Sequence, residues 1–245
     1  MEKKKIGLVI ILLVVFVGVL GAYYFYQPNK SSSTTSANRY VINVTYLPSP
    51  QLSGNMSVET AIQNRRSVRS FSNQALNISS ISQILWSAQG ITDNQSNLRA
   101  TPSAGQVYPL EMYVVVGNSS VNGLAPGAYH YVPSNNTLEK TVNGDLRSQL
   151  SSIATGQQSV NQAPVDFVIT GNYKKMIDKY KDPTLCTRFV DIEAGHAGEN
   201  MYLEAESMGI ATVAIGSFNE TQITQLLELP QNETPLYIFP TGYKS

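Results

Sequence analysis

An unbroken apolar stretch close to the N-terminus constrains this chain more than any other feature. Residues 6–22 are all apolar or glycine, and the aromatic residues 23–26 follow at once. A helix of about 20 apolar residues crosses a hydrocarbon core of about 30 Å, so the stretch is long enough for a transmembrane anchor. Lys3, Lys4 and Lys5 precede it, and positive flanks stay cytoplasmic. The sequence predicts a lysine cluster and single-pass anchor over residues 1–26, spanning the membrane through residues 6–26, with the rest of the chain extracytoplasmic.

A cleaved signal peptide is the alternative interpretation, although Gly21 and Ala22 make a poor cleavage site. Residues 27–38 are polar and rich in Ser and Thr, which is typical of a flexible linker. Glycosylation on the outer surface is a further expectation, because the acceptor pattern Asn-x-Ser/Thr recurs. It occurs at Asn29, Asn43, Asn55, Asn77, Asn94, Asn118, Asn135, Asn219 and Asn232.

Composition limits what the remaining domain, residues 39–245, can be. Lys+Arg and Asp+Glu both number 17, so no positive surplus is present to neutralise nucleic-acid phosphates. The single cysteine, Cys186, excludes an internal disulfide framework and a cysteine-rich metal site. With only His130 and His196 available, we expect no histidine-based metal centre either.

Helical and strand patterns alternate along residues 39–245 and predict an α+β or mixed α/β domain. A short helix is expected from near Ser57, and a second one, capped by Ser79 or Ser80, places its apolar residues on one face and ends at Gly90. A long helix is predicted from near Arg188 to Met208, with Gly209 as its stop. Strands are expected over 111–117, 127–132 (half-exposed, since its tyrosines alternate), 165–170, 210–215 and 236–239, with Pro235 and Pro240 bracketing the last.

Two segments carry residue types that suit an anionic, flat ligand. Arg65, Arg66, Ser67 and Arg69 lie in the segment RRSVRSF, and arginine forks bind phosphate oxygens bidentately. A solvated basic turn is the alternative. The segment TPSAG (101–105) predicts a tight loop whose backbone can approach a ring closely, although an ordinary loop before a strand would look the same.

Two further segments also have residues that would suit a flat ligand. The long helix contains EAGHAGEN, in which Gly195 and Gly198 leave room for close packing against another helix or a ring. After the strand at 210–215, the backbone N–H of Ile215 or Gly216 can face a ligand edge, although a plain strand-to-helix turn is again the alternative.

Taken together and in this order, these segments resemble the FMN-dependent nitroreductase family, and most closely its SagB-type dehydrogenase branch. The motifs that carry the resemblance are RRSVRSF, TPSAGQVYPLEMYVV, EAGHAGEN, GIATVAIGSF and PLYIFPTGYK, within residues 47–244. It implies a three-layer α+β sandwich with a central, mostly antiparallel sheet between helices. It also implies a homodimer with FMN bound at the shared interface.

The resemblance assigns roles to individual positions. Arg65, Arg66, Ser67 and Arg69 match the segment that holds the FMN phosphate and ribityl chain, and Lys244 is the candidate for a C-terminal basic residue near the phosphate. The loop along the flavin and the backbone at its N5 edge are matched by Pro102, Ser103, Ala104, Gly105, Ile215 and Gly216.

Lys179 and Tyr180 match a Lys-Tyr pair that azoline-oxidising SagB-type enzymes use for proton removal. A lysine can act as a base and a tyrosine can relay a proton, whereas the alternative is a solvated helix end. The resemblance thus implies an FMN-dependent oxidoreductase that transfers hydride through flavin N5 and acts on a small molecule or a peptide. The rival hypothesis is a non-catalytic domain of the same fold that binds a flavin-like ligand or a partner.

Overall fold

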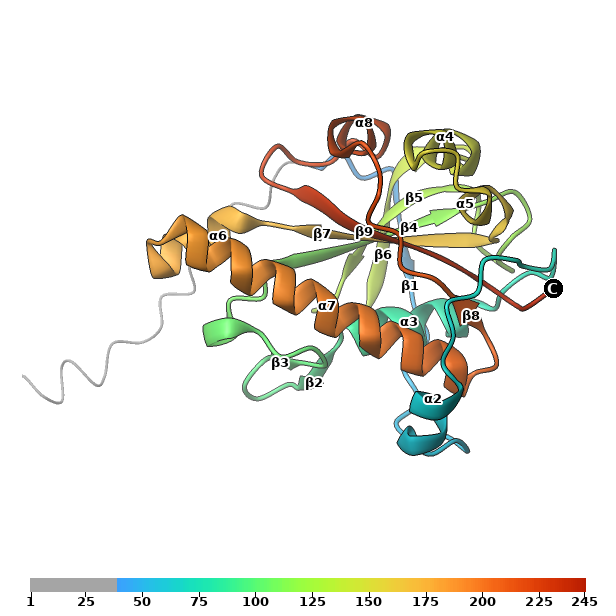
Figure 1. The fold of residues 1–245 in the computed structure, drawn as a ribbon, viewed down its shortest axis with the longest axis horizontal. Helices are drawn as coiled ribbons and strands as arrows, with labels where there is room; N and C mark the ends of the chain where they lie inside the picture. The colour runs from blue at the N-terminus through green and yellow to red at the C-terminus, as the bar shows by residue number, and fades with distance from the viewer. Residues whose placement is uncertain (1–38) are drawn as a thin grey trace, which may run out of the picture. The chain divides into compact units, whose positions relative to one another are not determined.

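A single antiparallel sheet organises residues 39–245, the part of the chain that the computed structural model describes. Its strand order is β1-β6-β5-β4-β7-β9-β8, and all its strand pairs are antiparallel (Figure 1). The strands are β1 (Asn43–Tyr46), β4 (Leu110–Val116), β5 (Gly127–Val132), β6 (Thr137–Asn143), β7 (Val165–Gly171), β8 (Ala211–Thr212) and β9 (Thr234–Gly242). A separate hairpin joins β2 (Ile91–Asp93) to β3 (Leu98–Arg99).

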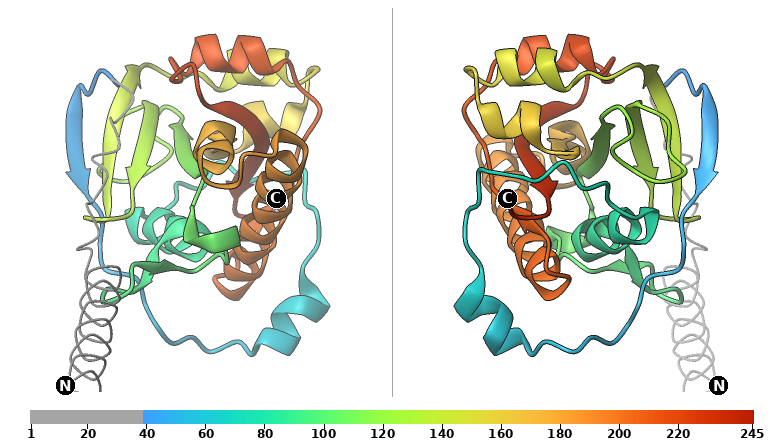
Figure 2. Two further views of the ribbon diagram at one scale, coloured as in Figure 1. Left: turned by 90° about the vertical axis from the view of Figure 1, so that its left-hand side faces the viewer. Right: turned by 90° about the vertical axis from the view of Figure 1, so that its right-hand side faces the viewer.

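Helices cover both faces of this sheet (Figures 1 and 2). One face carries α3 (Ile78–Gln89) and the long α7 (Pro183–Ser207). The opposite face carries α4 (Arg147–Ile153), α5 (Gln158–Gln162) and α8 (Glu220–Leu226). Two short helices contact α7, namely α2 (Val58–Asn64) and α6 (Tyr173–Tyr180), and a 3₁₀ turn covers Ala104–Gln106.

The two larger hydrophobic cores follow from the period-two alternation of a strand. On β4, Met112 and Val114 pack against α3 and α7, whereas Tyr113 and Val115 belong to the core under α4 and α8. Because the central strands are covered on both faces, each of them contributes to both cores. The predicted α+β architecture, with a central antiparallel sheet between helices, is confirmed.

Several boundaries differ from prediction for local reasons. Strand β5 is buried rather than half-exposed, because it lies between β4 and β6 and its tyrosines enter the α3 core. Helix α7 begins at Pro183, where the Asp182 side chain accepts a hydrogen bond from the Leu185 amide. The predicted brackets Pro235 and Pro240 lie inside β9, and helix α3 is preceded by Asn77 rather than by a serine cap.

The predicted single-pass membrane localisation is corrected here. Within residues 39–245, no helix combines the length and the apolarity that crossing a bilayer requires. The proposed anchor itself, residues 6–26, and the linker, residues 27–38, fall in the part of the chain that the structure leaves undescribed.

Candidate active site

The arginine segment runs from the end of α2 along the edge of the sheet. Arg65 is the C-cap of α2. Ser67 then forms a β-bridge with Thr212 on β8, and Phe71 forms one with Lys244 beyond β9. These two bridges fix the intervening residues, including Arg69, beside the C-terminal end of the chain.

Two side chains of this segment contact α7. The Arg65 guanidinium lies over the Tyr202 ring, 5.0 Å from its centroid, and its Nε is 3.8 Å from a Glu199 carboxylate oxygen. The hydroxyl groups of Ser67 and Tyr202 are 3.0 Å apart. Tyr202 therefore contacts both the Arg65 guanidinium and the Ser67 hydroxyl of the predicted phosphate-binding segment.

The other cationic side chains of this group are only partly neutralised by carboxylates of the described residues. Arg66 donates only to the carbonyls of Gln63 and Arg65, and within the described residues Arg69 has no acidic side chain within 4 Å. The Lys244 ammonium lies 3.5 Å from Glu206 on α7. Arg65 and Lys244 each face one carboxylate, whereas Arg66 and Arg69 face none among residues 39–245. The group therefore carries a net positive charge, which favours the binding of an anion here.

The turn after β8 approaches the same tyrosine. The Ala214 N–H donates a 2.7 Å hydrogen bond to Tyr202 Oη. The expectation that the Ile215 amide is free for a ligand is wrong, because Ile215 N–H donates to the Ile238 carbonyl at 2.8 Å. Gly216 is exposed, and its N–H has no partner among residues 39–245, so it is a donor that this turn offers.

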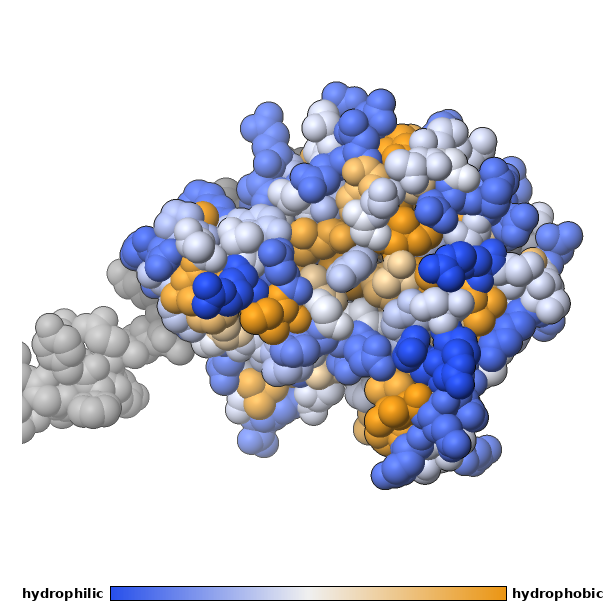
Figure 3. Space-filling model, viewed as in Figure 1, coloured by the Kyte–Doolittle hydropathy of each residue, from blue (hydrophilic) through white to orange (hydrophobic). Residues whose placement is uncertain are grey.

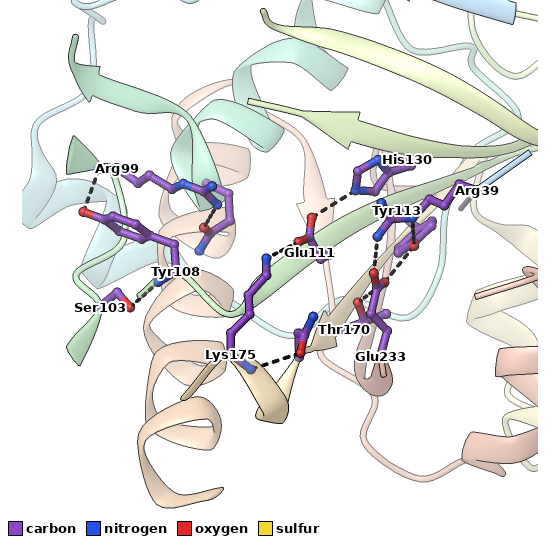
Figure 4. Close-up of polar contacts among 12 residues, drawn as sticks. Arg39, Arg99, Ser103, Tyr108, Glu111, Tyr113, His130, Thr170, Lys175 and Glu233 are labelled. Carbon is purple, nitrogen blue, oxygen red and sulfur yellow. Dashed lines mark hydrogen bonds and ion pairs between the residues drawn. The ribbon is translucent and has the colours of Figure 1, made fainter. Parts of the chain in front are cut away.

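The loop from Pro102 to Gly105 lies near the other end of α7. Its Ser103 Oγ accepts a 2.9 Å hydrogen bond from the Tyr108 N–H (Figure 4). Gly105 has φ +57, and a Cβ at this position would collide with the side chains of Lys179 and Tyr180. The left-handed φ favours glycine here, and the ends of the two side chains would have to shift for any larger residue.

The predicted catalytic pair meets this loop directly. The Lys179 ammonium, at the end of α6, donates to the Gly105 carbonyl. Tyr180 packs edge-on against Phe189 of α7, with ring centroids 5.3 Å apart. Lys179 is exposed and Tyr180 half-buried, so the pair is accessible and is held against the predicted flavin loop rather than projecting from an isolated helix end.

Helix α7 connects the two groups. Phe189 and Tyr202 are thirteen residues apart, which at 1.5 Å per residue is about 20 Å along the axis. The structure thus brings the arginine segment, Lys244 and Gly216 together at one end of the helix. It places Pro102–Gly105, Lys179 and Tyr180 together near the other end.

Sequence reasoning missed two α7 residues that lie beside these groups. Tyr202 was not singled out, although its spacing from Glu199 places both on one side of a helix. Glu193 was noted only as part of the EAGHAGEN motif, yet it is 1% exposed and burial raises the pKa of its carboxyl from 4.5 to about 7. The amide of Asn200 also secures this helix, since it donates to the Ser87 carbonyl at 3.0 Å.

A second charged cluster lies on the sheet face opposite α7 (Figure 4). Glu111 accepts from Lys175 Nζ at 2.6 Å and lies 3.0 Å from His130 Nε2. Burial opposes the charge of Glu111, but these two partners outweigh it and hold its pKa at about 2. Lys175 is therefore paired with a carboxylate. The same face carries a hydrogen-bonded group of Arg39, Tyr113, Thr170 and Glu233.

Comparisons with known proteins identify the family of this chain. The model of the nitroreductase family matches residues 62–243. A Methanocaldococcus jannaschii protein assigned to the nitroreductases is 34% identical over 77% of this chain and 92% of its own length. A solved structure of a Ralstonia eutropha protein with the same assignment is 30% identical, with a TM-score of 0.72, covering 86% of this chain and 91% of the other.

More distant relatives are named for specific activities. The microcin B17-processing protein McbC of Escherichia coli is 23% identical over 64% of this chain and 58% of its own length. An NADPH-flavin oxidoreductase of Vibrio harveyi is 27% identical over 44% of this chain and 47% of its own length.

The match begins within α2 and ends just after β9, so it includes both groups of side chains along α7 except Lys244. The family model covers most of the described residues, and the relative of greatest identity reported above is matched over nearly its whole length. By sequence and by fold, this chain belongs to the nitroreductase family.

Proposed function

We propose that the protein is an FMN-dependent oxidoreductase of the SagB-type dehydrogenase kind. The observation that carries the proposal is the convergence on Tyr202. Ser67 from the arginine segment and Ala214 from the turn after β8 both bond its hydroxyl. These segments lie far apart in the sequence, and the resemblance assigns both to the same cofactor.

The residues present suit FMN. Arg65, Arg69 and Lys244 would hold its phosphate, because cationic donors and uncompensated positive charge favour a phosphate group. Ser67 and Arg66 extend this donor set toward the ribityl chain. The exposed N–H of Gly216 would meet the ring edge.

The loop Pro102–Gly105 supplies a surface that a ring can approach, since Ala104 and Gly105 carry little or no side chain. Bound FMN would supply the redox chemistry, exchanging a hydride at N5. Lys179 and Tyr180 would hold and move a proton of the substrate next to this loop. The hydrogen bond from Lys179 to the Gly105 carbonyl fixes the ammonium there.

A homodimer is part of the proposal. Within residues 39–245 the outer side of α7 is uncovered: Ile192 is 49% exposed, and nothing lies within 4 Å of a Cβ added at Gly195. On α2, Val58 and Ile62 are 63% and 57% exposed, and Figure 3 shows apolar patches on this side of the molecule. A second copy would cover these residues, and sedimentation analysis tests it by the mass of the species in solution.

The substrate class of this proposal is a small molecule or a peptide, by similarity to the microcin B17-processing protein. The test is spectroscopic. Full-length protein purified with FMN should be yellow, and an added reductant should bleach it anaerobically. At least one member of a panel of nitroaromatics, quinones and azoline peptides should then change the flavin spectrum. Protein that stays colourless and takes up no FMN would favour the non-catalytic domain instead.

A further inference from the structure

Glu193 is a buried carboxyl without hydrogen bonds. It lies in the middle of α7 and is 1% exposed. Neither of its carboxyl oxygens has a hydrogen-bond partner among residues 39–245. Buried polar groups are nearly always paired, and an isolated buried charge is costly, so an orphan carboxyl in a folded core requires an explanation.

Two neutral side chains face this carboxyl with hydrogen-bonding capacity left. One is the Ser103 hydroxyl of the predicted flavin loop, and the other is the Gln89 amide at the end of α3. Gln89 Oε1 accepts from Arg99 Nη1 at 2.9 Å, but its Nε2 is itself buried and without a partner. Arg99 on β3 and Lys175 on α6 are the charged groups that act on Glu193.

The hydrogen bonds that Ser103 can still make decide how the protonation of Glu193 would affect it. A serine hydroxyl has one donor and two lone pairs, and one lone pair of Ser103 is taken by the Tyr108 N–H at 2.9 Å. A neutral Glu193 can donate its proton to the second lone pair, which leaves the Ser103 O–H free to donate toward the loop surface. An ionised Glu193 instead takes the Ser103 proton, which leaves only a lone pair for the loop surface.

We propose that Glu193 is a positioning residue whose protonation decides whether Ser103 offers a ligand on the loop Pro102–Gly105 a hydrogen-bond donor or an acceptor. The inference rests on the proposed flavin function, because the ring system of FMN carries mostly acceptor atoms on its polar edge. The neutral form of Glu193 then favours flavin binding. Burial favours that neutral form and places its pKa at about 7, which lies within the working range of an enzyme.

The first test needs no flavin. Carbon-13 NMR of full-length protein labelled at glutamate carboxyls follows each titration separately. Glu193 should titrate near neutral pH, and Ser103→Ala should move its midpoint upward, because the variant removes a donor to the ionised form. Glu204 is the internal control: it lies on the same helix but faces Gln83, so its midpoint should not move. A Glu193 midpoint near 4.5, or one that Ser103→Ala leaves unchanged, would overturn the proposal.

The second test measures FMN affinity by fluorescence between pH 6 and 8.5. The parent should lose affinity by about 2- to 10-fold more than Glu193→Gln across this range, the worth of one neutral hydrogen bond. Glutamine cannot ionise and donates to Ser103 through Nε2, so it mimics the neutral acid. The phosphate of FMN also titrates near pH 6, and for this reason the comparison is between parent and variant.

The two tests separate the inference from the proposed function. If the parent binds no FMN at any pH, the proposed function fails, whereas the NMR titration still reports on the Glu193–Ser103 contact. If FMN binds and Glu193→Gln shows the same pH dependence as the parent, the inference is wrong and the proposed function stands. Ser103→Ala is the further check. It should weaken FMN binding, and in its presence Glu193→Gln should no longer change the pH dependence of FMN affinity.

Discussion

The hydroxyl groups of Ser67 and Tyr202 lie 3.0 Å apart, and the same tyrosine oxygen accepts a 2.7 Å hydrogen bond from the Ala214 N–H. One phenol thus links the arginine segment, helix α7 and the turn after β8. Together with the β-bridge between Ser67 and Thr212, this side chain holds together segments that are separated by long stretches of chain.

Replacing Tyr202 by Phe should destabilise the fold and disturb the phosphate end of the site together. The variant leaves the half-buried Ala214 N–H without its partner, and an unsatisfied donor costs up to about 1–3 kcal/mol. Urea unfolding should show a lower midpoint than in the parent. The matched control is Tyr237→Phe, whose hydroxyl has no hydrogen bond to residues 39–245 and whose loss should change stability by less than about 0.5 kcal/mol. Equal midpoints for both variants would contradict the role given to Tyr202.

Variants of Lys179 and Tyr180 separate flavin binding from chemistry. Lys179→Ala and Tyr180→Phe should keep a bound-flavin spectrum but slow substrate-dependent flavin reduction by about 10²–10⁴-fold, the usual worth of general acid–base catalysis. Anaerobic single-turnover reduction measures this step apart from product release.

The contact of Lys179 with Gly105 allows a different result, in which the lysine has a structural role. If the ammonium only holds the loop, Lys179→Ala would weaken FMN binding while Tyr180→Phe leaves both binding and turnover intact. The exposed Lys174, which pairs with Asp178 on the outer side of α6, is the control whose replacement by Ala should alter neither. Parent-like rates for both variants would remove the pair from the mechanism.

Glu193 should make stability depend on pH. Its pKa is raised from 4.5 to about 7 by burial, so between these values the folded protein holds a proton that the unfolded chain has lost. The stability contributed at low pH is therefore lost as the pH rises toward 7 and above. A shift of this size corresponds to roughly 3 kcal/mol, and Glu193→Gln should gain that much relative to the parent between pH 4.5 and 8.

The measurement is urea unfolding of parent and variant at several pH values. Glu199→Gln is the control on the same helix, since that side chain is 53% exposed and its replacement should change stability little. A constant difference between the parent and Glu193→Gln at all pH values would show that Glu193 is ionised in the fold.

Much of the architecture could be predicted from local pattern. The long helix is marked by its spacing and by Gly209, which adopts φ +68 just beyond its end, and the apolar run of β4 indicates a buried strand. Strands β1 and β6 escaped prediction because sequences such as TLEKTVN lack a clear alternation. Their positions are decided by pairing with neighbours rather than by their own residues.

The candidate site could also be predicted only in part. Its motif residues are contiguous in sequence, so Arg65, Ser67 and Gly105 could be named directly. The register of β9 could not be foreseen, and it is this register that brings Ile238 opposite Ile215 and removes the Ile215 amide from the site. Tyr202 and Glu193 likewise gain their roles only from tertiary contacts.

The most direct test of the account is an FMN titration of the full-length protein, followed by quenching of flavin fluorescence. The parent should bind FMN saturably, and Arg65→Ala and Arg69→Ala should each weaken binding by roughly 10- to 150-fold, because each removes a charge-assisted hydrogen bond worth about 1.5–3 kcal/mol. Lys174→Ala, which removes a cation outside both groups, should bind as the parent does. Absence of saturable binding by the parent, or parent-like affinity in both arginine variants, would contradict the assignment of this site to FMN.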